Sequence, residues 1–276
     1  MVAYSHSRLS TFEQCKLRYK YRYIDKIIPE IEKTIEAHLG SMVHKTLEWL
    51  YNEARKGNLP SVDDMMLYYS RNWLQDYKDV LIPKKGMTDK DYFNKGVQFL
   101  LDYYNRYQPF QENTIALEKE IYIDLDESGK HKIRGFIDRL CYNLETHEYE
   151  IHDYKTSNTL PSQEKIDSDR QLALYSIAVR EMFPDTKTDK VRLIWHYLNF
   201  NKRIESRRTE EQLSQLKKET LELIKAIEST MDHEFTPTVS ILCDWCPYKP
   251  ICPAWNPGGS PGGDNSKFEK QMKLEF

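Results

Sequence analysis

The sequence predicts an α+β fold built around a three-stranded antiparallel meander. Hydrophobic residues recur with helical spacing before residue 110, and they alternate with polar residues from about Thr114 onward. A helix, a strand and a long helix are predicted to follow the meander. Helices, three consecutive strands, a helix and a further strand make up an order that is typical of α+β domains.

Length and composition fit one large domain or two ordinary ones. The chain has 276 residues, enough for a sizeable core, although only 39% of them are hydrophobic. Its 19 tyrosines, 10 phenylalanines and 5 tryptophans supply large amphipathic surfaces. No stretch approaches the ~20 apolar residues of a membrane span, and the first residues lack the apolar core of a secretory signal. We therefore expect a soluble, cytoplasmic protein with no membrane partner.

The first predicted elements are helices. One spans about residues 7–24 and is interrupted at Cys15. A second spans about residues 40–55, where His44 lies beside an apolar stripe. Two more amphipathic helices are predicted within residues 58–110, the second with Thr88 as its N-cap. We expect this pair to form a helical subdomain inserted ahead of the sheet.

The period of the hydrophobic pattern then changes to that of strands. The expected elements are three strands at about residues 114–126, 131–143 and 148–156, a helix at 168–182, strands at 190–200 and 203–208, and a helix at 209–230. The last stretch, residues 256–276, is rich in Gly and Pro, which predicts a disordered tail.

Two aspartates occupy opposed positions in the predicted hairpin. If residues 144–147 form a four-residue loop, antiparallel register places Asp138 directly opposite Asp153. Opposed Cβ atoms lie about 4.5–5.5 Å apart, where two negative charges are destabilising unless a cation lies between them. Lys155 points to the same face as Asp153, because side chains in a strand repeat with a period of two. This arrangement favours metal-assisted hydrolysis of a phosphodiester. The alternative is a surface hairpin with an ordinary ion pair.

A nucleic-acid-binding surface would have to be local, since the net charge is −3. One candidate is the run of residues 16–23, in which three tyrosines alternate with Lys16, Arg18, Lys20 and Arg22. Arginines near phosphates and aromatic rings under bases would suit single-stranded DNA. The alternative is a solvated helix whose tyrosines pack inward. A second basic group surrounds a predicted turn and consists of Lys202, Arg203, Arg207 and Arg208.

Three short motifs accompany this order of elements: GFIDRL contains Asp138, HDYKT contains Asp153 and Lys155, and RQLALY contains Gln171 and Tyr175. Together they resemble the PD-(D/E)XK nuclease superfamily, and within it the RecB-like branch that carries an iron–sulfur cluster. That branch includes the AddB nuclease domain and CRISPR-associated exonucleases. The resemblance implies a restriction-endonuclease-like core within one nuclease domain over residues 1–255, apart from the helices at 58–110.

The resemblance also implies roles for individual residues. His44, Asp138, Asp153 and the Tyr154 carbonyl would hold the metal, and Lys155 would orient or activate water. Gln171 and Tyr175 lie four residues apart on a predicted helix and so share a face, where the branch places them near the scissile strand and the lysine. A nitrogen ligand beside two carboxylates would shift preference from Mg²⁺ towards Mn²⁺.

The cysteines have an unusual distribution. Five cysteines in a chain expected in the cytosol argue for metal or reactive-thiol chemistry rather than disulfides. Cys141 is expected to be a buried structural thiol. By the resemblance, Cys15, Cys243, Cys246 and Cys252 match the branch's [4Fe-4S] ligand pattern, in which the cluster clasps the two ends of the domain. Zinc is the competitor, because four thiolates also suit that ion.

The function implied is that of a metal-dependent DNA exonuclease, acting on single-stranded DNA or DNA ends in repair, recombination or CRISPR adaptation. A helicase, a recombination protein or a CRISPR integrase would then be its partner. One alternative is a DNA-end-binding or scaffolding subunit of such a complex. Another is a structure-specific endonuclease or RNase on the same scaffold.

Overall fold

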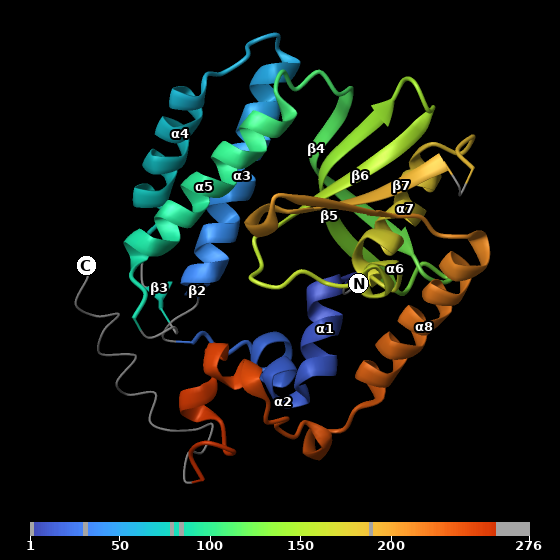
Figure 1. Ribbon diagram of the computed structural model, residues 1–276. Coiled ribbons are helices and arrows are strands. Elements are labelled where there is room, and N and C mark those ends of the chain that lie inside the picture. The colour runs from blue at the N-terminus through green and yellow to red at the C-terminus, as the bar shows by residue number, and fades with distance from the viewer. Residues whose placement is uncertain (1–2, 30–32, 78–79, 83–85, 188–189, 258–276) are drawn as a thin grey trace, which may run out of the picture. The chain divides into compact units, whose positions relative to one another are not determined.

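A computed structural model describes residues 3–29, 33–77, 80–82, 86–187 and 190–257 (Figure 1). The chain divides into two compact units. The larger unit comprises residues 1–9 and 33–229, and the smaller comprises residues 10–32 and 230–276. Of the predicted tail, residues 258–276 lie outside the described residues.

A six-stranded mixed sheet forms the centre of the larger unit. The predicted meander is confirmed as β4 (Thr114–Asp124), β5 (Lys132–Asn143) and β6 (Glu148–Lys155), which are antiparallel. The sheet continues from β6 to a parallel strand, β7 (Val191–Tyr197), and then to an antiparallel one, β8 (Lys202–Ser206). A two-residue strand that was not predicted, β1 (Ala3–Tyr4), pairs parallel with β5.

The connection from β6 to β7 is helical, as a crossover between parallel strands requires. It contains α6 (Gln163–Asp167) and α7 (Arg170–Met182), the second of which matches the predicted helix at 168–182. The Asp169 side chain caps α7 by accepting a hydrogen bond from the backbone N–H of Leu172 at 3.2 Å. After β7 come the short 3₁₀ turn η3 (Leu198–Phe200) and, beyond β8, the long helix α8 (Glu210–Ser229).

The helix that carries His44 is longer than predicted. It is α3 (Ile35–Arg55), and it begins at the Thr34 cap, whose side chain accepts from the backbone N–H of Ala37 at 3.3 Å. The predicted start at Gly40 is therefore wrong, because this glycine lies inside the helix. A Cβ built at Gly40 would lie 3.4 Å from Thr156 Oγ1, an ordinary contact distance, so this turn of α3 packs beside the residue that follows β6.

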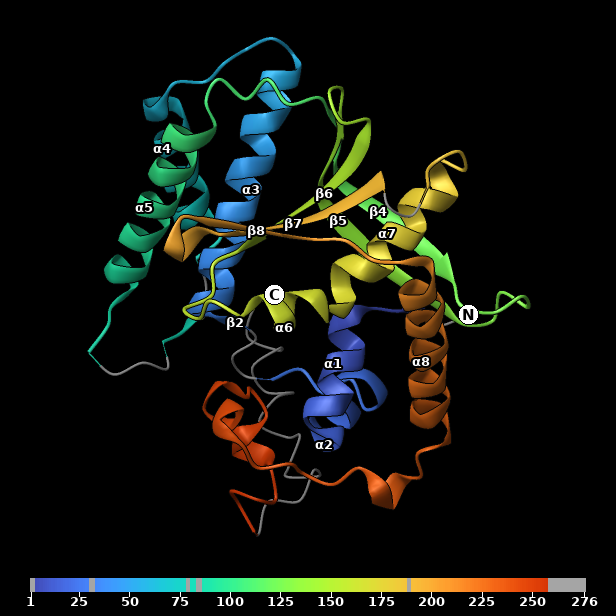
Figure 2. The same ribbon diagram turned by 45° about the vertical axis from the view of Figure 1, so that its right-hand side comes forward.

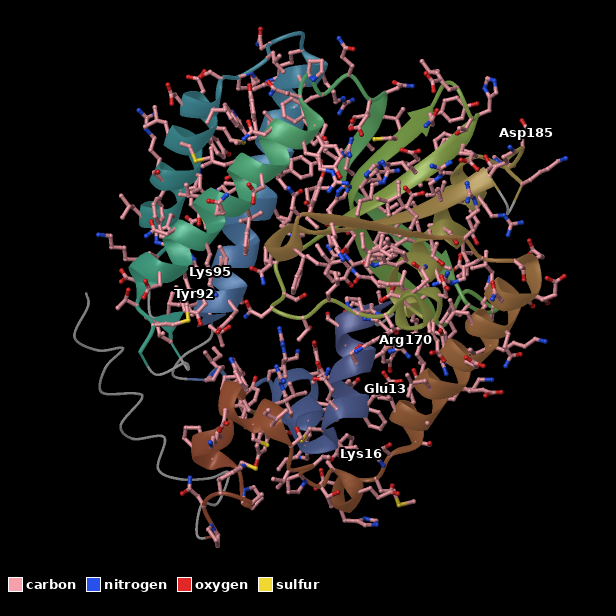
Figure 3. The ribbon with its side chains drawn as sticks, viewed as in Figure 1. Glu13, Lys16, Tyr92, Lys95, Arg170 and Asp185 are labelled. Atoms are coloured by element: carbon pink, nitrogen blue, oxygen red, sulfur yellow. The ribbon has the colours of Figure 1, made fainter. Side chains whose placement is uncertain are left out.

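Two further helices pack with α3 in the larger unit, and Figures 1 and 2 both show the three side by side. They are α4 (Val62–Gln75) and α5 (Asp89–Tyr107), and the predicted capping box at Thr88 is present in α5. On α5, Tyr92 donates to Glu36 of α3 at 2.8 Å and carries the Lys95 ammonium over its ring at 5.3 Å (Figure 3). The short parallel pair β2 (Lys33–Thr34) and β3 (Val80–Leu81) was not predicted.

The smaller unit is built from both ends of the chain. Helix α1 (His6–Gln14) enters it, and Cys15 then caps α2 (Lys16–Tyr19) in an extended conformation, so the predicted interruption at Cys15 is confirmed. A π-helix, η1 (Lys20–Ile24), follows. The later segment holds three 3₁₀ turns, η4 (Asp232–Glu234), η5 (Ile241–Trp245) and η6 (Lys249–Ile251). Leu17, Tyr21 and Tyr248 form the apolar centre of this unit.

Where the structure describes the chain, no helix is both long and apolar enough to cross a membrane.

Candidate active site

Asp138 and Asp153 meet where the hairpin of β5 and β6 opens. Asn143 pairs with Glu148, so the four-residue loop is confirmed, and the ladder ends at the pair Arg139 and His152. The next position in that register sets Asp138 opposite Asp153. There the backbone N–H of Tyr154 donates to Asp138 Oδ2 at 2.9 Å. A side-chain acceptor thus takes the place of a backbone acceptor from β5.

Lys155 links Asp153 to the helix α7. Its Nζ lies 2.8 Å from Asp153 Oδ2, 3.0 Å from Asp153 Oδ1 and 3.0 Å from Gln171 Oε1. Gln171 Nε2 in turn donates to the hydroxyl of Tyr175 at 3.5 Å. Burial alone would lower the pKa of Lys155, but the charge of Asp153 raises it above its ordinary value, so the ammonium stays protonated. The four residues Asp153, Lys155, Gln171 and Tyr175 form one connected chain of contacts.

His44 approaches the same point from α3. Its Nε2 lies 2.7 Å from the Tyr154 carbonyl oxygen, and its Nδ1 lies 3.4 Å from Asp138 Oδ2. Because a carbonyl oxygen only accepts hydrogen bonds, Nε2 carries the proton. In the neutral ring Nδ1 then presents a lone pair towards the Asp138 carboxylate. Only a proton or a cation between those two atoms makes this contact favourable.

Glu118 on β4 is a site residue that the sequence reasoning missed. Its neighbours Leu117 and Lys119 pair with Arg139 and Ile137, so it lies opposite Asp138. Its φ of 43° falls in the left-handed region, which an ordinary strand residue does not adopt. Because β5 lies between β4 and β6, Glu118 and Asp153 lie on opposite sides of Asp138. Three adjacent strands therefore each contribute one carboxylate at the same level of the sheet.

Burial changes the pKa values of two of these carboxylates. Burial raises the pKa of Glu118 to about 7, and the negative charge of Asp138 adds to the increase. Burial also raises the pKa of Asp138 to about 6, with His44 opposing and Asp153 adding to the rise. A cation bound among them would lower both values by favouring the ionised forms.

His44, Glu118 and Asp138 can act as one ligand set. Each offers a ligand atom within 4.8 Å of the others. An imidazole nitrogen and two carboxylate oxygens suit Mn²⁺, and the carboxylates alone suit Mg²⁺. Of the four ligands expected from sequence, the structure brings His44 and Asp138 to this point. Asp153 instead pairs with Lys155, and the Tyr154 carbonyl accepts a hydrogen bond from His44 Nε2.

A comparison with known protein families identifies the family to which this chain belongs. Residues 3–253 match the description of the PD-(D/E)XK nuclease superfamily. The chain belongs to that superfamily. Membership implies a metal-dependent nuclease that uses a divalent cation and acts on DNA, and the His44, Glu118 and Asp138 set is a site where this superfamily member could hold the cation.

Two other comparisons add little to this assignment. Among solved structures, the one titled "Crystal structure of SSO0001" matches with a TM-score of 0.37 and 15% identity, covering 90% of this chain and 95% of the other. No curated protein matches.

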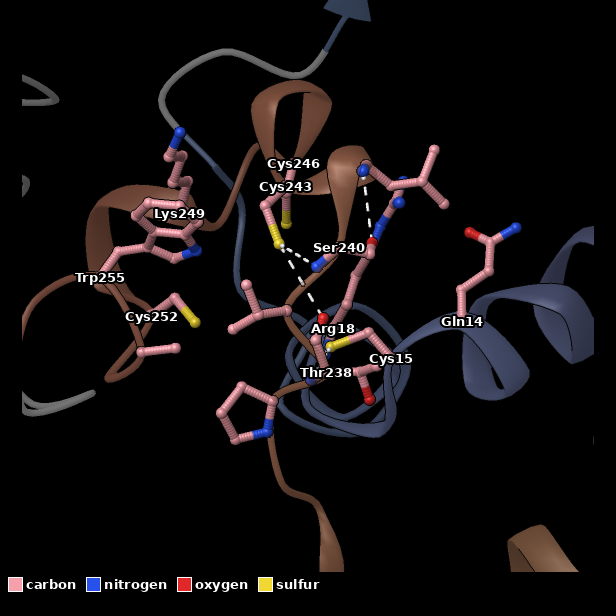
Figure 4. A pocket seen from close by; sticks show the side chains of 14 residues that line it. Gln14, Cys15, Arg18, Thr238, Ser240, Cys243, Cys246, Lys249, Cys252 and Trp255 are labelled. Atoms are coloured by element: carbon pink, nitrogen blue, oxygen red, sulfur yellow. Dashed lines mark hydrogen bonds between the residues drawn. The ribbon is translucent and has the colours of Figure 1, made fainter.

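In this PD-(D/E)XK protein four cysteines line one pocket of the smaller unit: Cys15, Cys243, Cys246 and Cys252 (Figure 4). All are free thiols. The backbone N–H groups of Arg18 and Thr238 donate to Cys15 Sγ at 3.5 and 3.4 Å, and that of Ser240 donates to Cys243 Sγ at 3.4 Å. Among the described residues, however, no three cysteine sulfurs lie within 4.8 Å of one another. Cys141 is buried on β5, as expected.

The basic run at residues 16–23 is largely engaged within the smaller unit. Lys20 pairs with Asp25 at 2.9 Å and with Asp232 at 3.3 Å. The other three basic side chains lie against rings or sulfur: Lys16 over Phe12, Arg22 over Tyr23, and Arg18 at the cysteine pocket. Tyr19 and Tyr21 are buried. These contacts favour the alternative in which the tyrosines of the run pack inward.

Three residues of the second basic group, Arg203, Arg207 and Arg208, also contact protein partners. Arg203 pairs with Glu205 at 2.8 Å, and Arg207 pairs with Glu148 at 2.8 Å. Arg208 is buried and donates to the carbonyl oxygens of Ile166 and Asp169, so it holds the turn between α6 and α7. These contacts have a structural role in the sheet and its crossover.

Proposed function

We propose that this superfamily member is a DNA exonuclease of the RecB-like branch, which degrades single-stranded DNA or works from free DNA ends. The observation that carries the proposal is the convergence of His44, Glu118 and Asp138 beside the pair of Lys155 and Asp153. Ligands for a cation and a charged amine near one point are the equipment for phosphodiester hydrolysis.

The cation site is proposed to contain His44, Asp138 and Glu118, with Asp153 and the Tyr154 carbonyl joining when Mn²⁺ or Mg²⁺ binds. When bound, the cation supplies Lewis-acid stabilisation of the charge on the scissile phosphate. For the Tyr154 carbonyl to bind the cation, its hydrogen bond with His44 Nε2 must break. This rearrangement is local, because His44, Asp138 and Tyr154 already contact one another.

Lys155 is proposed to act on the water that attacks the phosphate. Its ammonium stays charged beside Asp153, so it donates hydrogen bonds to that water and offsets negative charge that develops on the phosphate. Gln171 holds Nζ from the α7 side, and Tyr175 holds Gln171. These two residues therefore place the lysine, and their exposed atoms are proposed to contact the scissile strand.

A [4Fe-4S] cluster is proposed for the four-cysteine pocket. Backbone N–H groups donate to Cys15 Sγ and Cys243 Sγ, and hydrogen bonds to cysteine sulfurs are a feature of iron–sulfur sites. A single tetrahedral zinc ion would hold its sulfurs about 3.8 Å apart, given Zn–S distances of about 2.3 Å. A four-iron cluster separates them more widely, because each cysteine binds a different iron. A single zinc ion would therefore require three or more of these sulfurs to move closer together than they lie among the described residues.

The setting proposed for this activity is DNA repair, recombination or CRISPR adaptation, with a helicase, a recombination protein or an integrase as partner. Cleavage assays on labelled DNA test the biochemical part. Protein purified without oxygen is incubated with Mn²⁺ or Mg²⁺ and with 5′- or 3′-labelled single- and double-stranded DNA, open or circular. We expect processive shortening of open substrates and no cleavage of circles.

Two results would contradict this assignment. Cleavage of circular DNA would make the protein an endonuclease, and tight binding of free ends without turnover would make it a DNA-end-binding subunit. Lys155→Ala is expected to abolish turnover while the protein stays folded. Lys132→Ala is the matched control, because Lys132 also pairs with an aspartate of the sheet, Asp124, at 2.7 Å. Full activity in Lys155→Ala would show that the residues around Lys155 are not the active site.

A further inference from the structure

Behind the candidate site lies a buried guanidinium that the proposed reaction does not use. Arg139 follows Asp138 on β5 and is fully buried. A buried charge is costly unless it is paired and fully hydrogen-bonded. Its surroundings are accordingly polar, and we call them the Arg139 network: Arg139, Tyr51, Tyr103, Tyr107, Glu112, His152, Tyr154 and His196.

All three nitrogen atoms of the guanidinium donate hydrogen bonds. Nη1 donates to Glu112 Oε2 at 2.6 Å and to Cys141 Sγ at 3.2 Å, Nη2 donates to His152 Nδ1 at 2.9 Å, and Nε donates to the Tyr154 hydroxyl at 2.9 Å. The ring of Tyr51 lies 4.0 Å from its central carbon. A lysine could not reproduce this planar set, since its ammonium is a single point of charge.

The hydrogen bond from Arg139 to His152 also determines which ring nitrogens carry protons further along the network. Because a guanidinium only donates, His152 Nδ1 must accept and its proton sits on Nε2. His196 Nε2 lies 2.9 Å from the same Nδ1, so it is the donor of that contact. The Tyr107 hydroxyl, 3.2 Å away, then donates to His196 Nδ1. Burial lowers the pKa of both histidines well below the ordinary value, in agreement with two neutral rings.

Tyr154 joins this network to the candidate cation site. Its N–H donates to Asp138 and its carbonyl accepts from His44, while its hydroxyl accepts from Arg139 and lies 3.2 Å from the Tyr103 hydroxyl. The backbone pairing of β5 with β6 stops two residues before Tyr154, at the pair Arg139 and His152. The side-chain bond from Arg139 to Tyr154 therefore spans the two strands where their ladder ends.

We propose that the Arg139–Tyr154 hydrogen bond is a positioning contact for the cation site, which sets the separation of Asp138 from Asp153 and the direction of the Tyr154 carbonyl. The proposal rests on the proposed function, since it concerns the same cation. Groups that orient metal ligands typically change metal affinity about 10- to 100-fold when they are lost. The consequence here is a weaker and less selective site without loss of any ligand.

Tyr154→Phe tests this contact, because it removes one hydroxyl and leaves the backbone groups in place. The measurement is Mn²⁺ binding without DNA, by electron paramagnetic resonance of the free ion and by calorimetry. We expect Tyr154→Phe to bind Mn²⁺ about 10-fold more weakly than the wild type. Hydrogen exchange in the cation-free protein should also show faster exchange at the Tyr154 amide, because its partner Asp138 is no longer held in place.

Tyr51→Phe is the matched control. It also removes a buried hydroxyl of the Arg139 network, one bonded to Tyr103 and Glu112, but it leaves the Arg139–Tyr154 bond intact. We expect Tyr51→Phe to bind Mn²⁺ as tightly as the wild type does and to lose about as much thermal stability as Tyr154→Phe. That result would separate positioning of the cation site from general destabilisation. Equal Mn²⁺ affinity in Tyr154→Phe, or an equal loss in both variants, would overturn the proposal.

The same measurements separate this inference from the proposed function. Wild-type protein that binds no Mn²⁺ would remove the cation site itself. Wild-type protein that binds Mn²⁺ as tightly as Tyr154→Phe does would leave the cation site standing and remove only the role of the Arg139–Tyr154 bond. Arg139→Lys provides a second variant, expected to weaken Mn²⁺ binding in the same direction because the lysine cannot keep all four hydrogen bonds.

Discussion

Gly135 on β5 lies directly against the ring of Tyr175, so that a Cβ built at Gly135 would be 2.4 Å from Tyr175 Cε1. No real Cβ tolerates such a contact, and the tyrosine is buried and cannot swing aside. The glycine of the GFIDRL motif thus leaves room for the residue that holds Gln171, which in turn holds Lys155.

Gly135→Ala is therefore expected to displace Tyr175 and reduce nuclease turnover by about 10- to 100-fold, as small misplacements of catalytic groups do. Turnover per folded molecule is the quantity to measure. Gly96→Ala is the control, because its Cβ would meet Tyr69 Oη at 2.0 Å in the helices α4 and α5. That variant should lose about 1–3 kcal/mol of stability through overpacking and keep its turnover. Unchanged turnover in Gly135→Ala would show that Tyr175 does not place the lysine.

Glu118 is predicted to be a cation ligand in its own right. Glu118→Gln keeps the size of the side chain but removes a negative charge beside Asp138, so half-maximal activity should need at least about 10-fold more Mn²⁺. Glu120→Gln is the comparison, since Glu120 lies two residues away on the same strand and is exposed, bound to Arg134 at 2.6 Å. An equal Mn²⁺ requirement in the two variants would assign Glu118 a structural role only.

The opposition of Asp138 and Asp153 could be predicted because the turn between their strands is defined locally. The Asn143 side chain accepts from the backbone N–H groups of Glu145 and Thr146, and His147 closes the loop with a φ of 56°. A polar residue that bonds its own turn fixes the loop length, and loop length fixes the register. The position of Lys155 on the same face as Asp153 could then be predicted from the two-residue period of side chains in a strand.

The position of Glu118 could not be predicted, because it depends on a longer turn. Strands β4 and β5 close with Asp124 opposite Lys132, which leaves residues 125–131 in the connection. A connection that closed one residue later on β4 would set Lys119 opposite Asp138 instead. The left-handed bend at Glu118 and the approach of His44 from α3 are tertiary features, and neither has a local sequence signal.

The raised pKa values at the cation site predict how stability depends on pH. Asp138 and Glu118 have pKa values of about 6 and about 7 in the folded protein, against ordinary values of 3.8 and 4.5. The folded state therefore binds more protons than the unfolded state between roughly pH 4 and pH 7. Stability from these groups is fully present below the ordinary pKa values and is lost as pH rises through the folded ones. The loss is on the order of several kcal/mol for the cation-free protein, at about 1.4 kcal/mol for each pH unit that separates a folded pKa from its ordinary value.

Thermal melts in a chelator between pH 5 and pH 8 check this dependence. The melting temperature of the wild type should fall as pH rises, and Glu118→Gln should flatten the curve because the amide does not ionise. Saturating Mn²⁺ should reverse the trend, since the cation binds the ionised carboxylates and competes with protons. A melting temperature that rises with pH in the chelated wild type would contradict the raised pKa values.

The cysteine pocket predicts that colour and stability are lost together. Cys15 is contributed by the first segment of the smaller unit and Cys246 by the second, so a bound cluster would cross-link two segments more than two hundred residues apart. Cys15→Ala and Cys246→Ala should each give colourless protein whose melting temperature is lower by roughly 10 °C or more, because metal binding is coupled to folding. Absorption spectra and iron analysis of protein purified without oxygen provide the measurement.

Cys141→Ala separates a general effect of thiol loss from loss of the cluster. Its thiol is buried on β5 beside Thr114 and lies in the larger unit, outside the four-cysteine pocket. This variant should lose some stability to the small cavity that it creates, yet keep its colour and its iron content. Wild-type protein that contains one zinc ion and no iron would replace the cluster with a structural zinc site, and the sulfurs would then have to close to about 3.8 Å from one another.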